Sequence, residues 1–188
     1  MPHQIAIERT ARERYGPAAV ALHWVMLVLV VAVYASILAR ENFPRGSDIR
    51  EGLKVLHFTL GLSVLGLGGA RLALRILAWK TPEITPRPPQ FLVWLSLAAH
   101  TAIYALLIAM PIAGWLILSA EGKPIMLWGF NLPPLVGADE SLARSVKELH
   151  ETGGMAGYFL IGLHAAAALF HHFVMKDNTL IRMLPENR

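Results

Sequence analysis

Four apolar stretches, each about as long as a membrane-spanning helix, constrain this chain more than any other feature of its sequence. A helix needs about 20 apolar residues to cross a hydrocarbon core about 30 Å thick. Of the 188 residues, 55% are hydrophobic and only 16% are charged, which is unlike a soluble domain. We therefore predict one all-α domain over residues 1–188, an integral membrane four-helix bundle. Its helices are expected at about 18–38, 55–77, 91–118 and 150–175.

The first apolar stretch has an alternative interpretation as a signal peptide, because Arg9, Arg12 and Arg14 precede it. However, the stretch is longer than the roughly 7–15 apolar residues of a signal sequence. It also carries His23, for which a discarded segment has no need. A spanning helix is therefore the favoured interpretation.

The distribution of basic residues predicts the orientation in the membrane. Ten of the 17 Lys and Arg residues lie in the N-terminal segment, in the connection between the second and third stretches together with Arg71 and Arg75 just before it, and in the C-terminal tail. By the positive-inside rule, both termini are expected in the cytoplasm. The net charge of +4 then reflects topology. No basic stripe with interleaved aromatic residues is present, so no nucleic-acid partner is predicted.

Two histidines, His150 and His164, lie fourteen residues apart on the fourth predicted helix. Fourteen residues rise about 21 Å and return to within roughly 40° of the same face. Both imidazoles therefore point the same way at different depths. Such a helix is suited to hold two haems and to carry electrons across the membrane.

Depth also supplies partners for these two histidines. His57 is expected beside His150 at the outer side, and His23 beside His164 at the inner side. Each iron would gain two axial imidazoles, which suits electron transfer better than oxygen binding. The chain has no cysteine, so disulfides, iron–sulfur clusters and thioether-linked haem are excluded. Two alternatives remain. The histidines could merely bond carbonyls of a haem-free scaffold, or they could bind a bare metal ion, although two pairs separated by about 20 Å cannot share one ion.

Further polar residues cluster towards the inner side. His171 follows His164 by seven residues on the same face, with Lys176 a further turn on, which suits a quinone headgroup. The alternative is an interfacial histidine and a snorkelling lysine. Arg71 and Arg75 are one turn apart and suit haem propionates, although interfacial anchoring explains them equally well. His100 is expected either to line the inner haem pocket or to replace His23 as a ligand.

Two glycines, Gly61 and Gly157, fall on the predicted ligand faces. A flat macrocycle can pack against a helix only where a residue without a side chain leaves room for it. Close packing between helices uses small residues in the same way, so both interpretations stay open for these positions.

Five short segments carry a resemblance to a known family. They are Val20-Ala-Leu-His-Trp24, Lys54-Val-Leu-His57, Glu148-Leu-His-Glu-Thr152, the stretch from Gly162 to His172, and Lys176-Asp-Asn-Thr-Leu180. With them the chain resembles the bacterial cytochrome b561 family, and within it the quinone-linked superoxide oxidases above all. The resemblance covers essentially the whole chain, including the loop order.

The resemblance implies a four-helix cytochrome of the bacterial inner membrane with two b haems, ligated by His23, His57, His150 and His164. It further implies an oxidoreductase that takes electrons from superoxide at the periplasmic face, releases O2 and reduces ubiquinone. His171 and Lys176 match the quinone-end residues of the family. Membrane lipid, superoxide and ubiquinone are thus the expected partners, with no obligate protein partner.

One alternative function is a dihaem anchor subunit that passes electrons between a partner dehydrogenase or hydrogenase and quinone. Its histidine layout is similar, but the short outer loops offer no large docking segment. Seven basic residues are available near the outer side to steer an anionic substrate, interspersed with acidic ones, and the sequence assigns none of them to superoxide. They are Arg40, Arg45, Arg50, Lys54, Lys123, Arg144 and Lys147.

Overall fold

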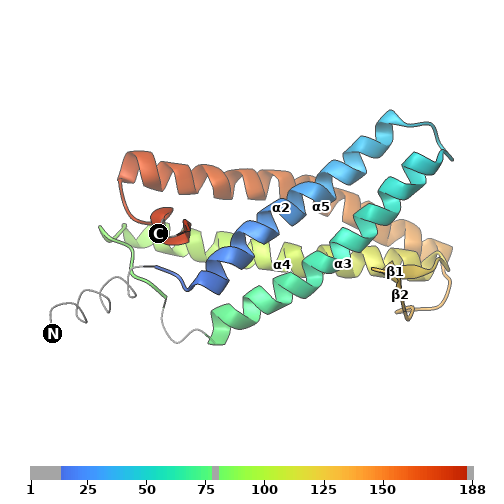
Figure 1. The fold of residues 1–188 in the computed structure, drawn as a ribbon, viewed down its shortest axis with the longest axis horizontal. Helices are drawn as coiled ribbons and strands as arrows, with labels where there is room; N and C mark the ends of the chain where they lie inside the picture. The colour runs from blue at the N-terminus through green and yellow to red at the C-terminus, as the bar shows by residue number, and fades with distance from the viewer. Residues whose placement is uncertain (1–13, 78–80, 186–188) are drawn as a thin grey trace.

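The computed structural model describes residues 14–77 and 81–185. Within them, four long helices dominate: α2 (Pro17–Ala39), α3 (Asp48–Leu77), α4 (Gln90–Ala120) and α5 (Glu140–Phe170) (Figure 1). Each is long and apolar enough to cross a membrane. Shorter elements are the 3-10 turns Arg40–Asn42 and Ile181–Met183, the π-helical turn His171–Met175, and strands β1 (Ile125–Leu127) and β2 (Phe130–Leu132). The predicted all-α membrane bundle is confirmed, with one small hairpin added.

Two helices begin well before the predicted positions. We expected the last helix from about residue 150, but α5 starts at Glu140, and α3 starts at Asp48 rather than at about 55. The extra turns of α5 are too polar to count as a membrane segment, yet they have a strong start signal. The Asp139 carboxylate accepts hydrogen bonds from the backbone N–H groups of Ser141 and Leu142, both at 3.0 Å. Such a cap stabilises a helix by about 1 kcal/mol, so α5 extends beyond its apolar part.

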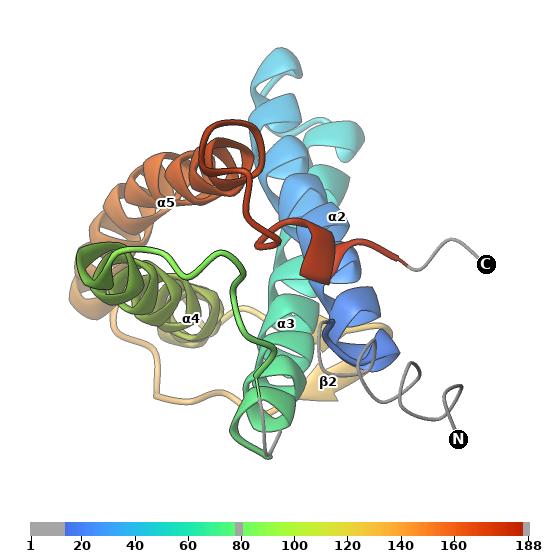
Figure 2. The ribbon, with the colours of Figure 1, turned by 90° about the vertical axis from the view of Figure 1, so that its left-hand side faces the viewer.

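The helices pack in chain order: α2 against α3, α3 against α4, and α4 against α5. Figure 2 shows α4 and α5 on one side and α2 and α3 on the other. The first and last helices, α2 and α5, have only sparse backbone proximity. Side chains bridge this α2–α5 seam, where the Tyr34 hydroxyl donates to the Gly154 carbonyl at 3.0 Å. The seam therefore depends on few contacts.

The Tyr34 hydroxyl fits against α5 because residue 157 is a glycine. A Cβ atom at Gly157 would overlap that hydroxyl and lie 3.3 Å from a methyl group of Leu106. We expect Gly157→Ala to lower the free energy of unfolding by about 1–3 kcal/mol, the usual cost of overpacking. Thermal unfolding in detergent, followed by circular dichroism, measures this change.

The matched control for that substitution is Gly162→Ala, one and a half turns further along α5. A Cβ atom at Gly162 would meet no atom within 4 Å. Because alanine favours the helix over glycine, this variant should unfold at the same or a slightly higher temperature. Equal unfolding temperatures for the two variants would contradict the packing role of Gly157.

The end of the bundle that carries the α2–α3 and α4–α5 connections is called the outer end. There a hairpin packs on α3 and α4 through a small core of Leu62, Leu118 and Ile125. Its two-residue turn, Trp128–Gly129, has positive φ at both positions, 50° and 91°. Such a turn matches the twist of a short antiparallel pair. The hairpin adds two short strands to the predicted all-α bundle.

The opposite, inner end of the bundle is closed by residues 176–184, here called the C-terminal cap. The cap joins the last helix to the start of the first helix and to the α3–α4 connection. Asn178 and Arg182 make the links to the α3–α4 connection: Asn178 exchanges hydrogen bonds with Thr85, and Arg182 donates to the Pro82 carbonyl. The link to α2 is the hydrogen bond that the Trp24 indole donates to the Met183 carbonyl at 2.7 Å. Burial lowers the pKa of the Arg182 guanidinium from its ordinary value.

Candidate functional site

Towards the outer end, His57 of α3 and His150 of α5 face each other. Their ring centres are 6.3 Å apart and the ring planes meet at 80°. The Nδ1 atom of His57 lies 3.0 Å from the Val33 carbonyl oxygen. A carbonyl only accepts, so this nitrogen carries the proton and Nε2 is left with a free lone pair. The buried Nδ1 of His150 has no hydrogen-bond partner within the described residues.

Towards the inner end, the structure brings three histidines from three helices together. His23 of α2 and His164 of α5 have ring centres 6.3 Å apart, with planes at 68°. His100 of α4 lies closer to His164, with 5.4 Å between ring centres. Its Nδ1 is 2.6 Å from the Ser96 carbonyl oxygen. The two sequence-predicted pairs are thus adjacent in space, and His100 joins the inner one.

The separation within each pair fits a metal held between two imidazoles. A metal–nitrogen bond of about 2 Å and about 1.1 Å from nitrogen to ring centre, on both sides, give about 6.2 Å. Both pairs match this value at 6.3 Å, although they come from different helix combinations. In the described residues, no group of three or more His, Cys, Asp or Glu side chains is placed to hold one metal ion. Two-ligand sites of this kind suit a haem iron, because the porphyrin supplies the other ligands.

Glycines shape the space around these pairs in different ways. Gly114 of α4 lies against His150, where an added Cβ would stand 3.5 Å from the imidazole Cε1. A Cβ atom added at Gly61 would meet no atom within 4 Å, so room beside a macrocycle stays a prediction there. Gly157 instead serves close packing between helices, because Tyr34 and Leu106 fill the space beside it. Gly114 was missed because its spacing from the histidines on other helices cannot be read from sequence.

The two arginines predicted for propionates lie near the inner histidines. Arg71 acts electrostatically on His23, His100 and His164, and donates to the Ala19 carbonyl at 3.3 Å. The guanidinium of Arg75 lies 5.9 Å from the ring centre of Tyr104. Positive charge is therefore concentrated at this level of the bundle, where an anionic group would be stabilised.

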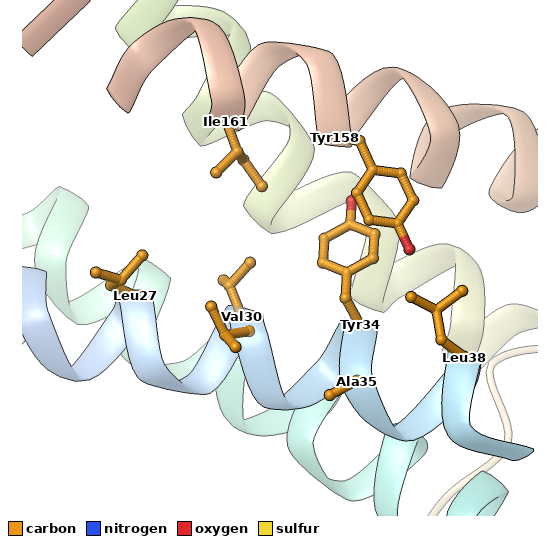
Figure 3. Close-up of a pocket in the computed structure, with 8 residues that line it drawn as sticks. Leu27, Val30, Tyr34, Ala35, Leu38, Tyr158 and Ile161 are labelled. Atoms are coloured by element: carbon orange, nitrogen blue, oxygen red, sulfur yellow. The ribbon is translucent and has the colours of Figure 1, made fainter. Parts of the chain in front are cut away.

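An apolar groove of about 340 Å³ follows the α2–α5 seam between the two histidine levels (Figure 3). Two of its lining residues, Tyr34 and Tyr158, contact each other with ring centres 4.2 Å apart. Leu27, Val30, Leu38 and Ile161 also line it (Figure 3). No charged side chain lines this groove, so this part of the α2–α5 seam is apolar.

A polar groove of about 460 Å³ lies at the outer end. Five basic and two acidic side chains line it: Arg40, Arg45, Arg50, Lys54, Lys147, Glu41 and Glu51. Lys54 and Lys147 each lie one turn outward from a histidine of the outer pair, His57 and His150. Of the seven basic residues noted in the sequence, five gather here, whereas Lys123 and Arg144 do not line the groove.

Ion pairs divide the basic side chains of this groove into two kinds. Glu41 pairs with Arg40 and Arg50, and Glu51 pairs with Lys54 at 2.6 Å. Arg45 and Lys147 have no acidic partner within the part of the chain that the structure describes. The groove therefore keeps positive charge that is available to an anion.

The predicted quinone residues lie at the inner end, where helix geometry changes. We expected His171 and Lys176 on a continuous α-helix, but α5 ends at Phe170 and a π-helical turn follows. The Nδ1 of His171 contacts the buried Asp177 carboxylate at 2.5 Å, while Lys176 is exposed with φ of 54°. This contact and the hydrogen bond from Asp177 N to the His171 carbonyl close the turn.

Asp177 is a site residue that the sequence analysis missed. Burial opposes its ionisation, but hydrogen bonds from His171 and Thr179 hold the pKa of its carboxyl below the ordinary value of 3.8. It is therefore a carboxylate at neutral pH. Helical periodicity gave no signal for this pair, because the six-residue spacing is bridged only after the helix has ended.

Comparison with known proteins identifies the family. The profile of prokaryotic cytochrome b561 matches residues 14–186. The chain is 38% identical to a Yersinia pestis protein named probable superoxide oxidase CybB, over 94% of this chain and 98% of that protein. It is 35% identical to cytochrome b561 homolog 1 of Escherichia coli K12, over 93% and 99% of the two chains. It is also 34% identical to homolog 2 of the same organism, over 92% of each.

A profile match over nearly the whole chain and relatives covered almost from end to end establish the relationship. It agrees with four helices able to span a membrane and with paired histidines suited to haem iron. The chain therefore belongs to the prokaryotic cytochrome b561 family, as a multi-pass electron-transfer protein of the bacterial inner membrane that binds b haem.

Proposed function

We propose that this protein is a dihaem superoxide oxidase that passes electrons from superoxide at the periplasmic face to ubiquinone. The observation that carries the proposal is the pair of 6.3 Å histidine separations at two depths. His57 and His150 would hold the outer haem b, and His23 and His164 the inner one. Arg71 and Arg75 would contact the inner propionates. When bound, the haems supply two one-electron carriers with both axial positions filled.

The distribution of positive charge supports the direction of transfer. Eight of the 17 basic residues belong to the N-terminal segment, the α3–α4 connection and the C-terminal tail, which join the inner ends of the helices, and Arg71 and Arg75 lie towards the inner end of α3. The positive-inside rule then places the inner end and both termini in the cytoplasm. The outer histidine pair consequently lies nearer the periplasm.

The polar groove at the outer end supports superoxide as the donor. Superoxide is a small anion, and local positive charge raises its concentration and its rate of arrival. Lys54 and Lys147 bring that charge within one turn of His57 and His150. Each superoxide would give up one electron and leave as O2, so this half-reaction needs no proton at the outer end.

The inner end supports a quinone as the acceptor. Reduction of one ubiquinone takes two electrons, hence two superoxide ions, and two protons. His171 is held by Asp177 through Nδ1, so its Nε2 remains available to hydrogen-bond a quinone oxygen. Lys176 adds an exposed positive charge next to this pair.

We expect His171→Ala to separate the two half-reactions. The haems should still be reduced by superoxide at the normal rate, because His171 lies far from the outer groove. Their reoxidation by a short-chain ubiquinone should slow by roughly tenfold or more, because general acid catalysis of this kind contributes about 10²–10⁴-fold. Stopped-flow absorbance of the haem bands measures both steps. Normal reoxidation in this variant would remove His171 from the quinone site.

Rapid mixing of the oxidised, haem-loaded protein with superoxide tests the proposed function as a whole. Haem reduction should outpace spontaneous dismutation, O2 should be released, and added ubiquinone should reoxidise the haems. Haem reduction too slow to compete with dismutation would overturn the proposal. The electron-transfer anchor of a partner dehydrogenase or hydrogenase would then be the better account, and a co-purifying soluble partner should be found.

A further inference from the structure

His100 is the third histidine of the inner group, and the proposed ligation of haem leaves it without a role. Its ring centre lies 5.4 Å from that of His164, with the ring planes at 82°. This distance is shorter than the 6.3 Å that separates His23 from His164. It is also shorter than the roughly 6.2 Å needed for a metal between two imidazoles. His100 therefore does not have the spacing of an axial partner to His164.

The protonation of His100 follows from its contact with the backbone. Its Nδ1 lies 2.6 Å from the Ser96 carbonyl oxygen, which can only accept a hydrogen bond. Nδ1 must therefore carry the proton. In the neutral imidazole, Nε2 is then an acceptor with a free lone pair.

His164 needs an acceptor of this kind. A histidine that binds metal through one nitrogen carries a proton on the other, and almost always donates it to a neighbouring group. No hydrogen bond from the His164 ring occurs within the described residues. An N–H···N bond of about 3 Å plus about 1.1 Å from each nitrogen to its ring centre gives about 5.2 Å. The observed 5.4 Å is close to this value.

We propose that His100 is the positioning residue of the inner haem site: when His164 binds the iron, its Nδ1–H donates a hydrogen bond to Nε2 of His100, a bond that the ring separation of 5.4 Å allows but that the two rings do not make in this structure. This inference rests on the proposed ligation of the inner haem by His164. The chain of hydrogen bonds would then run from the Ser96 carbonyl, which His100 already contacts, through His100 to His164. It fixes the tautomer and orientation of His164 and raises its basicity as a ligand.

A hydrogen bond from His164 to His100 would change the reduction potential of the inner haem, whereas packing between the two rings alone would not. A more basic axial imidazole stabilises the oxidised iron, so His100 holds the reduction potential of the inner haem down. Removing the acceptor should favour the reduced form of that haem by about tenfold. For one electron, this corresponds to a rise of about 59 mV.

Redox titration of the purified, haem-loaded protein tests this with three variants. His100→Phe, which keeps a ring but lacks an acceptor, should retain two haems and raise the potential of the inner haem alone. His100→Gln, which keeps an acceptor oxygen, should restore much of the original potential. His172→Phe is the matched control in the π-helical turn outside the histidine pairs, and it should leave both potentials unchanged.

The outcomes separate this inference from the proposed function. Loss of one haem in His100→Phe would make His100 an axial ligand and overturn the positioning role. Two haems with unchanged potentials in His100→Phe would likewise overturn it, while leaving the dihaem proposal intact. Wild-type protein that binds no haem would instead overturn the proposed function itself.

Discussion

Replacing His150 with alanine is expected to halve the haem content of the purified protein, from two haems per chain to one. Each proposed iron has two protein ligands, and removing one leaves a half-ligated site lined by apolar side chains. His57→Ala should remove the same haem, because His57 and His150 face each other at 6.3 Å. Pyridine haemochrome analysis against protein concentration gives the stoichiometry, and redox titration shows which haem remains.

The same variants should also stop the overall reaction at its first step. Without the outer haem, superoxide has no electron acceptor near the groove, whereas the inner haem should still titrate normally. His172→Ala serves as the control, because His172 is a histidine outside both pairs. Retention of two haems in both His57→Ala and His150→Ala would refute the outer pairing. Loss of different haems in the two variants would do so as well.

Reversing the charge of Lys147 is expected to slow haem reduction by superoxide by about tenfold at low ionic strength. Local positive charge speeds the arrival of an anion by roughly 10–10³-fold, and Lys147 is one of two groove cations without an acidic partner in the described residues. The Lys147→Glu variant therefore removes one positive charge and adds a negative one beside the outer pair. Stopped-flow mixing at several superoxide concentrations gives the second-order rate constant.

A matched substitution one turn away tests whether position matters. Arg144→Glu makes the same change of charge on α5, but Arg144 does not line the groove. It should slow the reaction far less. The effect of Lys147→Glu should shrink as salt is added, because the Debye length falls to about 8 Å at 0.15 M. Equal slowing by both variants would mean that net charge, and not the groove, attracts the anion.

The features that could be predicted from sequence are those set by helical repetition. Apolar length gave the four spanning helices, and depth along them paired His57 with His150 and His23 with His164, as the structure arranges them. These predictions succeed because a spanning helix has a fixed rise per residue and little freedom of register. Histidines at matched depth on the helices of a small bundle therefore lie close to one another.

The features that escaped prediction depend on local capping or on contacts between distant segments. The polar start of α5 rests on the Asp139 cap, and the π-helical turn after Phe170 rests on the contact between His171 and Asp177. The contact of Gly157 with Tyr34 depends on how two helices rotate against each other. Periodicity within one helix contains no information about such rotations.

The helix α5 contributes one histidine to each pair, whereas α2 and α3 contribute one histidine each. This asymmetry has a consequence for biosynthesis. Because α5 follows the other three long helices in the chain, neither pair is complete until α5 has been synthesised. With the proposed ligation, haem loading therefore follows the synthesis of α5, and chains truncated before α5 should accumulate without haem.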